Sequence, residues 1–450
     1  MSVFTGAYGD KRRASSMSTL FEAMVEQCST VVRKIGGDRS GEMAAHRVLS
    51  SDRVTPAETV TCLARPTADA VAGRRIVAAQ DTTEVNFPGR LSRGLGPAGR
   101  MGKTPGFFLH ATVAVDVEED AVLGLVGAEV WTRTGEAAPD RRERTLEEKE
   151  SRRWLTAAEQ AAERLHQASQ IIMVGDRESD FYALFARRPP TVALLVRAAQ
   201  DRNLDDGTKL FAAADAWPDL GSQTVKVAPR GPGDAGRDAQ VALRAGTVVL
   251  RHPRNARREG DPDGLRVSVV EAIERAPPPG KTPLHWRLLT TLPATTEAEA
   301  AEIVRLYRLR WRIEQTFRML KSDGLRIEEC QTAEPHRLFN LTALATAAAV
   351  RIIQLVDARD GSSRPASDVA DAIQIAAAEA LCPKLEGKTE RQKNHHPRGS
   401  LAWISWVVAR LGGWNCYYKP PGPKTMRDGW HRFAAIAEGF ALTQHTNQNV

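Results

Sequence analysis

Three carboxylates stand where a metal site for phosphoryl transfer could form. Asp81 ends a short apolar run that begins at Ile76 and Val77, and Asp176 directly follows the apolar segment IIMVG. Glu314 lies in a strongly helical segment, AEIVRLYRLRWRIEQTFRMLKSDG. Magnesium takes hard oxygen ligands, and two ions about 4 Å apart stabilise the attacking and leaving oxygens together. These three residues are therefore candidate metal ligands, although a turn or N-cap aspartate would suit either aspartate alone.

The helical segment around Glu314 places further polar groups on one face. Tyr307, Arg310, Glu314 and Lys321 stand at offsets of zero, three, seven and fourteen. At about 100° per residue they project within a stripe roughly 60° wide. An apolar stripe adjoins it, formed by Ile303, Leu306, Ile313, Phe317 and Leu320. The spacing predicts a polar face at the edge of a core, although an ordinary Arg310–Glu314 pair on an exposed helix would give the same pattern.

The elements that would position the two aspartates follow the order of an α/β core. Strand candidates cover 76–81, 110–117 and 122–131, a probable helix covers 146–168, and the next strand runs into Asp176. Three strands, a helix and a strand that ends in an acidic residue predict a ribonuclease-H-like core.

The pattern of apolar and polar residues changes twice in the rest of the chain. Between about 200 and 292, short runs alternate apolar and polar residues and are separated by turn-rich stretches, which predicts an antiparallel β insertion. From 297 onward the pattern is mostly helical. Apolar residues at helical spacing over 11–34 predict a small helical module at the amino terminus. Near the other end, Trp403, Trp406 and Trp414 either pack on the core or form the expected self-association surface.

Composition narrows the class of protein. Of the 450 residues 42% are hydrophobic and 26% charged, as in a globular protein of several domains. Because we find no apolar run of about 18 residues and no signal peptide, we expect a cytoplasmic protein without membrane contact. Five scattered cysteines argue against a disulfide framework or a zinc finger. The net charge of +7 favours a polyanionic partner.

The four polar residues of the helix form the pattern Y-x2-R-x3-E-x6-K. This pattern resembles the signature of the IS-4 family of bacterial DDE transposases, whose well-studied members are Tn-5-like. The likeness covers essentially the whole chain. QDTT at 80–83 is similar to the first-aspartate motif and GDRESD at 175–180 to the second, and EKESRRW at 148–154 and RLGGW at 410–414 match as well.

The resemblance implies a role for each matching residue. Asp81, Asp176 and Glu314 would be the catalytic triad and would bind two Mg²⁺ ions, for which Mn²⁺ can substitute. The activity would be cut-and-paste transposition: water cuts one strand at each transposon end, and the freed 3′ hydroxyl attacks the opposite strand to form a hairpin. Water then opens the hairpin, and the hydroxyl attacks target DNA. The partners would be double-stranded DNA and a second copy of the chain, in a bacterial cytoplasm at the nucleoid.

Four further residues would contact DNA. By resemblance, Tyr307, Arg310 and Lys321 would hold the phosphates at the cleaved end. Trp286, in PLHWRLLTT, would stack on a base flipped out at the hairpin. An aromatic face can recover part of the unstacking cost, about 1–3 kcal/mol per base. A buried tryptophan on a strand is the alternative reading of Trp286.

The expected architecture is an α/β fold with three parts. A helical N-terminal DNA-binding domain would cover 1–70. A ribonuclease-H-like DDE catalytic domain would cover 71–355, with the β insertion at about 200–292, and a helical C-terminal dimerisation region would cover 356–450. In the family the helical domain begins further upstream of the GD-x-RR motif, here Gly9–Arg13. We therefore expect a first DNA-contacting helix to be absent or short.

Three other functions compete with this one. GPAGRMGKT at 96–104 ends like a phosphate-binding loop, but Pro97 occupies the position of its first glycine. A non-catalytic DNA-binding regulator would bind DNA and inhibit transposition without cutting. A domesticated nuclease would cut but not integrate, and strand-transfer products would exclude it.

Overall fold

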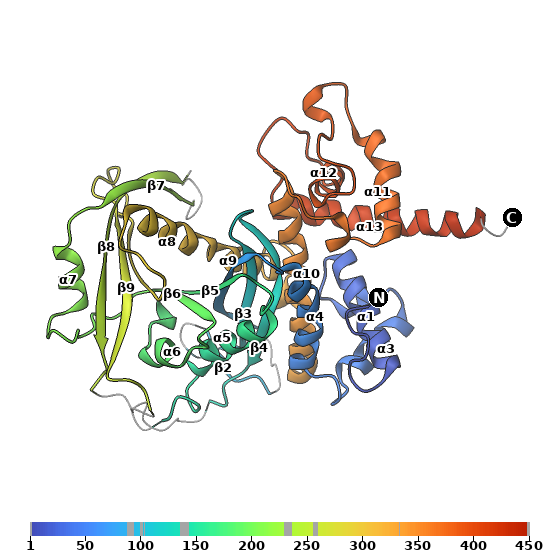
Figure 1. Ribbon diagram of the computed structural model, residues 1–450. Helices are drawn as coiled ribbons and strands as arrows, with labels where there is room; N and C mark the ends of the chain where they lie inside the picture. Colours follow the sequence, from blue (N-terminus) through green and yellow to red (C-terminus); the bar gives the residue numbers. More distant parts are fainter. Residues whose placement is uncertain are drawn as a thin grey trace. The chain divides into compact units, whose positions relative to one another are not determined.

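The computed structural model describes residues 2–87, 94–99, 102, 104–135, 144–228, 236–254, 260–332 and 334–447 (Figure 1). The chain divides into two compact units. Unit 1 comprises Met1–Ala72, Thr82–Glu136 and Arg312–Val450, and unit 2 comprises Gly73–Asp81 and Ala137–Trp311. Strand β1 (Arg75–Asn86) begins in unit 2 and continues into unit 1.

Unit 2 is built on a mixed sheet with the strand order β1-β5-β6-β10-β9-β8-β7. β5 pairs parallel with β1 and with β6, whereas each pair from β6 to β7 is antiparallel. The strands are β5 (Gln170–Gly175), β6 (Val192–Arg197), β7 (Gly221–Val227), β8 (Arg237–Arg251), β9 (Gly264–Ile273) and β10 (His285–Thr290). The antiparallel insertion expected between about 200 and 292 is confirmed, because β7 to β10 all fall within it.

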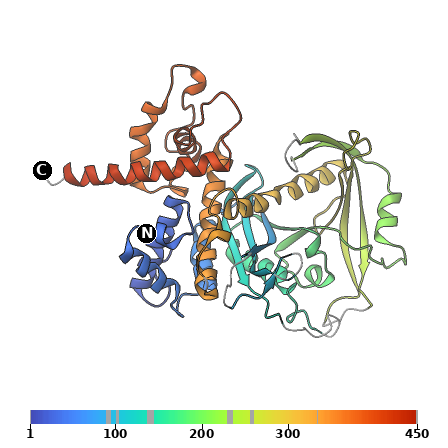
Figure 2. The ribbon, with the colours of Figure 1, turned by 180° about the vertical axis from the view of Figure 1, so that it is seen from behind.

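Helices cover this sheet. α5 (Arg152–Arg164) packs on β5 and β6, and α7 (Leu210–Ala216) packs on β8. α8 (Glu297–Leu309) lies against β6, β7, β8 and β9, as both ribbon views show (Figures 1 and 2). A capping box fixes where α8 begins, since Thr296 and Glu299 bond each other's backbone N–H groups. The short helices η1 (Arg177–Ser179) and α6 (Tyr182–Arg187) follow β5.

Unit 1 has its core around α10 (Pro335–Ala358), which packs on β4 (Ala121–Trp131) and α4 (Pro56–Ala70). β4 pairs antiparallel with β3 (Thr104–Asp116), which also pairs with the two-residue β2 (Pro97–Ala98). By length and hydropathy α10 could cross a membrane, but 89% of its apolar window is buried. Its apolar character is therefore that of a core helix.

The amino-terminal part of unit 1 is helical, as expected. α1 (Lys11–Gln27) buries Met17, Leu20, Phe21, Met24 and Val25, which are the apolar positions of the predicted helix. That helix ends earlier than residue 34, because Cys28 adopts a left-handed conformation with φ of 45°. α2 (Val32–Ile35) and α3 (Arg39–Leu49) follow.

The carboxyl-terminal part of unit 1 is also helical, but two of its tryptophans, Trp403 and Trp406, do not lie on a self-association surface. The helices are α9 (Trp311–Leu320), η2 (Ile327–Glu329), η3 (Ala366–Asp368), α11 (Ala372–Leu385), η4 (Glu390–Gln392), α12 (Leu401–Leu411) and α13 (Pro423–Asn447). Trp403 and Trp406 are only 4% and 5% exposed, so the expectation is wrong for both. α12 is buried along most of its length between α10, α11 and α13, and these side chains complete that core.

The mixed α/β architecture and its large mixed sheet fit the ribonuclease-H-like core expected from the sequence. The boundaries of the N- and C-terminal domains remain predictions.

Candidate catalytic and DNA-binding site

Asp81 and Asp176 occupy equivalent positions on neighbouring parallel strands of unit 2. β1 and β5 are paired from Arg75 opposite Gln170 to Ala79 opposite Val174. Continuing this register by two residues brings Asp81 opposite Asp176. Neighbouring strands lie about 4.8 Å apart, and residues in register project to the same face. The two carboxylates therefore lie beside each other at the carboxyl end of β5, where α/β proteins present their ligand sites, although β1 itself continues past Asp81 to Asn86.

The turn that holds Asp176 is tightly packed. The Asp176 carboxylate accepts a hydrogen bond from the Glu178 backbone N–H at 2.9 Å and caps η1. A Cβ on Gly175 would lie 2.3 Å from Ser179 Oγ and 3.1 Å from the fully buried Trp154, so only glycine fits there. Arg153 on α5 reaches the same turn through an ion pair with Glu178 at 2.9 Å. These contacts fix the backbone from which the carboxylate projects.

Arg310 contacts the first aspartate. Its Nη1 donates to Asp81 Oδ2 at 2.9 Å, and the side chains are 14% and 18% exposed. A pair so well shielded from water is stronger than an ordinary surface ion pair. Arg310 follows the last residue of α8, where its N–H bonds the Tyr307 carbonyl three residues back. The predicted single helix is thus interrupted here, because the backbone tightens to an i→i−3 bond before α9 begins.

Tyr307 joins the same cluster. The Arg310 guanidinium carbon lies 5.8 Å from the centroid of the Tyr307 ring. Arg197, at the end of β6, and Asp176 are close enough for their charges to act on the phenol. Burial raises the pKa of Tyr307, and the two guanidinium groups partly offset this effect. Burial lowers the pKa of Arg197, and the neighbouring Arg177 and Arg310 cations act in the same direction. A phosphate would relieve the repulsion among these cations.

Trp286 lies next to this cluster. Its ring meets that of Tyr307 edge to face, with centroids 5.2 Å apart, and the side chain is only partly buried. From the other face of β10, His285 Nε2 and Arg287 Nε both bond Oε1 of the fully buried Glu271, at 2.7 and 2.6 Å. Since adjacent residues on a strand face opposite ways, Glu271 holds both neighbours of Trp286 and leaves its ring on the Tyr307 side.

Glu314 and Lys321 belong to unit 1. Glu314 lies in the first turn of α9, where the helix dipole favours a carboxylate. Lys321 follows the end of α9, and its Nζ donates to the Glu84 carbonyl of β1 and lies 3.7 Å from Glu328. Nearby on β1, Thr82 hydrogen-bonds the buried His110 at 2.9 Å. The structure thus brings Asp81, Asp176, Tyr307, Arg310 and Trp286 together in unit 2, whereas the grouping of Glu314 with the two aspartates remains a prediction.

Comparison with protein families adds to this geometry. Residues 129–351 match the family model of the transposase DDE domain. The match supports assignment of this chain to a DDE transposase family. It spans Asp176, Glu314 and the Tyr-Arg-Glu-Lys residues, and it begins after Asp81. A transposase acts on DNA, so the cation-rich cluster around Tyr307 has a chemically suitable ligand in the DNA phosphates.

The donor set of this site suits a hard divalent ion. Asp81 and Asp176 offer carboxylate oxygens from two rigid strands, as magnesium prefers. Within the described ranges, no group of three or more His, Cys, Asp and Glu side chains is arranged to hold a metal ion. The aspartates fit as a pair, and a third ligand must come from elsewhere.

The sequence motifs missed one residue of the cluster around Tyr307. Arg197 ends the apolar strand β6 and carries no motif, so only its place beside Tyr307 in the structure identifies it. An apolar strand that ends in arginine beside a strand that ends in aspartate is the signal that could have indicated Arg197.

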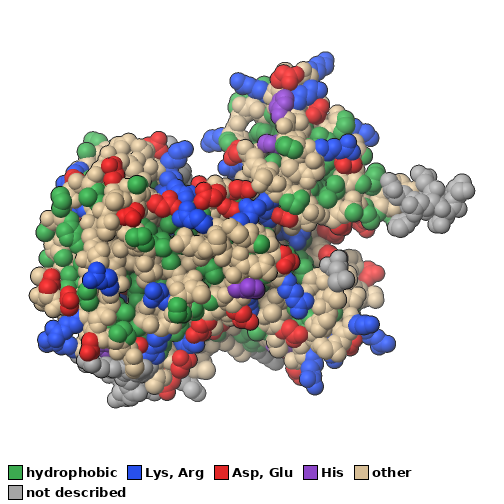
Figure 3. Space-filling view, viewed as in Figure 1, with side chains coloured by type: hydrophobic (Ala, Val, Ile, Leu, Met, Phe, Trp, Pro, Cys, Tyr) green, Lys and Arg blue, Asp and Glu red, His purple; other side chains and the backbone are tan. Residues whose placement is uncertain are grey.

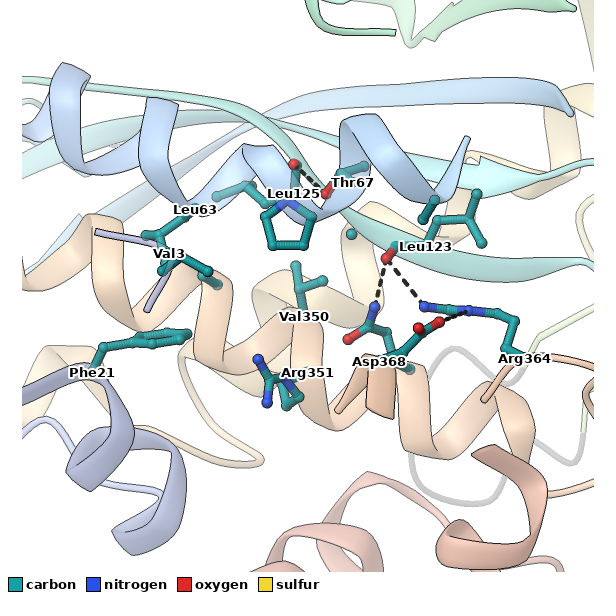
Figure 4. A pocket seen from close by; sticks show the side chains of 15 residues that line it. Val3, Phe21, Leu63, Thr67, Leu123, Leu125, Val350, Arg351, Arg364 and Asp368 are labelled. Carbon is teal, nitrogen blue, oxygen red and sulfur yellow. Dashed lines mark hydrogen bonds and ion pairs between the residues drawn. The ribbon is translucent and has the colours of Figure 1, made fainter. Parts of the chain in front are cut away.

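A cavity in unit 1 contains none of the predicted residues. It has a volume of about 80 Å³ and is lined by residues of α1, α4, β4, α10 and η3 (Figure 4). Arg364 Nη1 bonds the Val122 carbonyl at 2.8 Å, and Nε pairs with Asp368 at 2.7 Å. Thr67 donates to the Leu125 carbonyl at 2.8 Å. These bonds tie α4 and η3 to β4, and we interpret the cavity as a packing defect of that junction.

Proposed function

We propose that this chain is a cut-and-paste DNA transposase. One observation carries the proposal: in unit 2, a pair of aspartates in register adjoins a phenol and two guanidinium groups that can bind phosphate. Asp81, Asp176 and Glu314 would hold two Mg²⁺ ions, or Mn²⁺ in their place. When bound, such ions polarise the phosphoryl oxygen and provide a nucleophile at neutral pH.

The cationic residues would position the DNA. Arg310 and Arg197 converge on Tyr307, so a phosphate there could receive hydrogen bonds from two planar guanidinium groups and the phenol. For Arg310 this requires exchange of the Asp81 carboxylate for a phosphate. Lys321 would add a point charge further along the backbone. Contacts of this kind fix the register of the duplex and carry no sequence information.

Trp286 would support the hairpin. A hairpin end needs a sharp bend of the backbone, and a partly exposed ring beside a phosphate site can stack on the base that leaves the duplex. Because Glu271 clamps both neighbours of Trp286, the ring would be held in place before DNA binds, which lowers the entropic cost of stacking.

A homodimer would hold both transposon ends. Support comes from apolar residues that unit 1 leaves exposed: Ile373 on α11, at 46%, and Ile436 and Leu442 on α13, at 38% and 66%. α11 and α13 pack against each other, so one partner could cover all three side chains.

The test is cleavage of a linear duplex that carries the two ends of the encoding element, in Mg²⁺ or Mn²⁺. We expect hairpin and double-strand-break products from wild type and none from Glu314→Gln. Glu163→Gln, at an exposed position of α5, should behave as wild type. Equal cleavage by Glu314→Gln would remove that residue from the triad. DNA binding without cleavage by every variant would instead indicate the non-catalytic regulator.

A further inference from the structure

We infer that two loops of unit 1 form a second surface that binds the phosphate backbone of duplex DNA, apart from the cluster around Tyr307. The loops are residues 386–400, between α11 and α12, and residues 412–422, between α12 and α13. We call them the basic platform; its exposed side chains are Lys388, Arg391, Tyr417, Tyr418 and Lys419. The inference rests on the proposed function, since it names a further contact with the same substrate class.

The charge of the chain is concentrated around the platform. Residues 383–424 contain eight Lys and Arg and two Glu, a net charge of +6, compared with +7 for the whole chain. Figure 3 shows Lys and Arg side chains over this part of unit 1, with acidic side chains among them. A segment of this kind attracts a polyanion, and the attraction should fall steeply with salt.

Acidic groups pair with two of these cations and, among the residues that the structure describes, leave others unpaired. Arg398 pairs with Glu379 of α11 at 2.7 Å. Glu386 is engaged within its own loop, where it accepts from the Asn394 N–H at 3.0 Å and pairs with Lys393 at 3.4 Å. The first of these bonds is the main reason why the pKa of Glu386 is lowered. Glu390 is the other acidic residue of the loop. Lys388, Arg391 and Lys419 make no hydrogen bond or ion pair through their side chains with any residue that the structure describes, so their charges are available to a ligand.

The two loops are held side by side. Thr389 Oγ1 and the Tyr417 hydroxyl hydrogen-bond at 2.6 Å, and this contact brings Lys388 and Tyr418 to one surface. At the base of the loops, Arg410 bonds the Leu385 carbonyl through Nε and Nη2 and the Trp414 carbonyl through Nη1. The surface is therefore ordered before any ligand binds, which reduces the entropic cost of binding.

The exposed tyrosines favour nucleic acid over an acidic polypeptide. Tyr418 is 82% exposed, and Tyr417 is 43% exposed although it bonds Thr389. A tyrosine among cations can pack on deoxyribose and donate to a phosphate, both of which recur along a duplex. An acidic protein partner would need no such aromatic face. A basic surface with protruding tyrosines thus fits the backbone of a duplex.

The experiment uses the full chain and a duplex of random sequence, with the dissociation constant measured by fluorescence anisotropy over a range of salt. The platform variant is Lys388→Glu with Arg391→Glu and Lys419→Glu. We expect its dissociation constant to rise roughly tenfold or more, and its salt slope to fall by about 2 to 3, since each phosphate contact contributes about 0.9. Cleavage at saturating DNA should keep its maximal rate, because no residue of the catalytic cluster is changed.

The matched control reverses three exposed cations of unit 2, Lys226, Arg251 and Arg266, and should change the slope much less. An unchanged slope in the platform variant, while wild type binds, would overturn the inference and leave the proposed function intact. So would loss of a dimer in sedimentation with DNA affinity unchanged, because the surface would then bind a second copy. If wild type bound no duplex at all, the proposed function would fail as well. Circular dichroism establishes that each variant is folded.

Discussion

Arg310 Nη1 donates a hydrogen bond to Asp81 Oδ2 at 2.9 Å, so a guanidinium group lies against the first aspartate of the candidate triad. The contact offsets part of the negative charge of this carboxylate. Asp81 and a DNA phosphate would also compete for Arg310, because the guanidinium group cannot bond a phosphate and keep this geometry with Asp81. Occupation of the site by DNA and by metal should therefore be coupled.

Removal of the Arg310 side chain should weaken DNA binding. We expect Arg310→Ala to raise the dissociation constant for duplex DNA and to reduce the salt slope by about 1. Arg308→Ala is the matched control, because Arg308 lies on the same helix and is exposed. An unchanged slope for Arg310→Ala would count against phosphate contact.

Isosteric replacement of the aspartates should separate binding from cutting. We expect Asp81→Asn and Asp176→Asn each to abolish cleavage in Mg²⁺ while DNA affinity stays within a fewfold of wild type. The asparagine at 176 can still cap η1, so the melting temperature should change little. Near-normal cleavage by either variant would exclude that residue from the triad.

Trp286 should act at the hairpin step. We expect Trp286→Ala to nick transposon ends at a near-normal rate and to form hairpins slowly, because the flipped base loses its stacking partner. Trp286→Phe should restore part of the hairpin rate. If nicking and hairpin formation fell equally, the ring would be a structural contact of Tyr307.

Gly175→Ala should disturb the Asp176 turn. The added methyl would lie 2.3 Å from Ser179 Oγ and 2.8 Å from its Cβ, and overpacking of this kind costs about 1–3 kcal/mol. We expect a lower denaturation midpoint and loss of cleavage. Gly439→Ala, on α13 with no atom within 4 Å of the new Cβ, should be neutral or stabilising. A wild-type midpoint for Gly175→Ala would mean that the turn adapts.

The raised pKa of Tyr307 predicts an alkaline effect on stability. Burial favours the neutral phenol, so the folded-state pKa exceeds the usual 10.0. As pH rises above 10, the unfolded chain ionises first, and the stability that depends on the neutral phenol is lost as pH passes the folded-state pKa. Tyr307→Phe should therefore lose less stability than wild type between pH 10 and 12 in denaturant titrations. A steeper loss in the variant would contradict the burial argument.

The sequence predicted the strands of unit 2 well, because buried strands leave strong local signals. The apolar run that stops at Asp176 marks the end of β5, and alternation at Val241 and Leu243 marks the insertion. The predicted end of β1 was wrong, because the strand continues past Asp81 to Asn86 with mostly half-buried side chains that form no apolar run.

Tertiary context decided what the sequence did not show. The helix is interrupted at Arg310 because one turn tightens to an i→i−3 hydrogen bond. The spacing of apolar residues along the sequence does not reveal such a turn. Trp403 and Trp406 are buried in the core of their own chain. The sequence could not predict this, because the same apolar spacing would also suit a surface that a partner covers. Arg197 belongs to the site only because β6 pairs with β5. The spacing of residues within one strand does not predict which strands pair.

Unit 1 is formed by three stretches that are separate in the sequence, and this affects how the chain folds during synthesis. α4 ends at Ala70, but α10, which packs on it and on β4, begins at Pro335. At about 5–20 residues per second, the ribosome needs roughly 10 to 50 s to make the intervening chain. During that time the apolar face of β4 lacks its partner helix. We therefore expect the nascent chain to need protection by chaperones, and an mRNA truncated before the α10 codons to yield an aggregation-prone product.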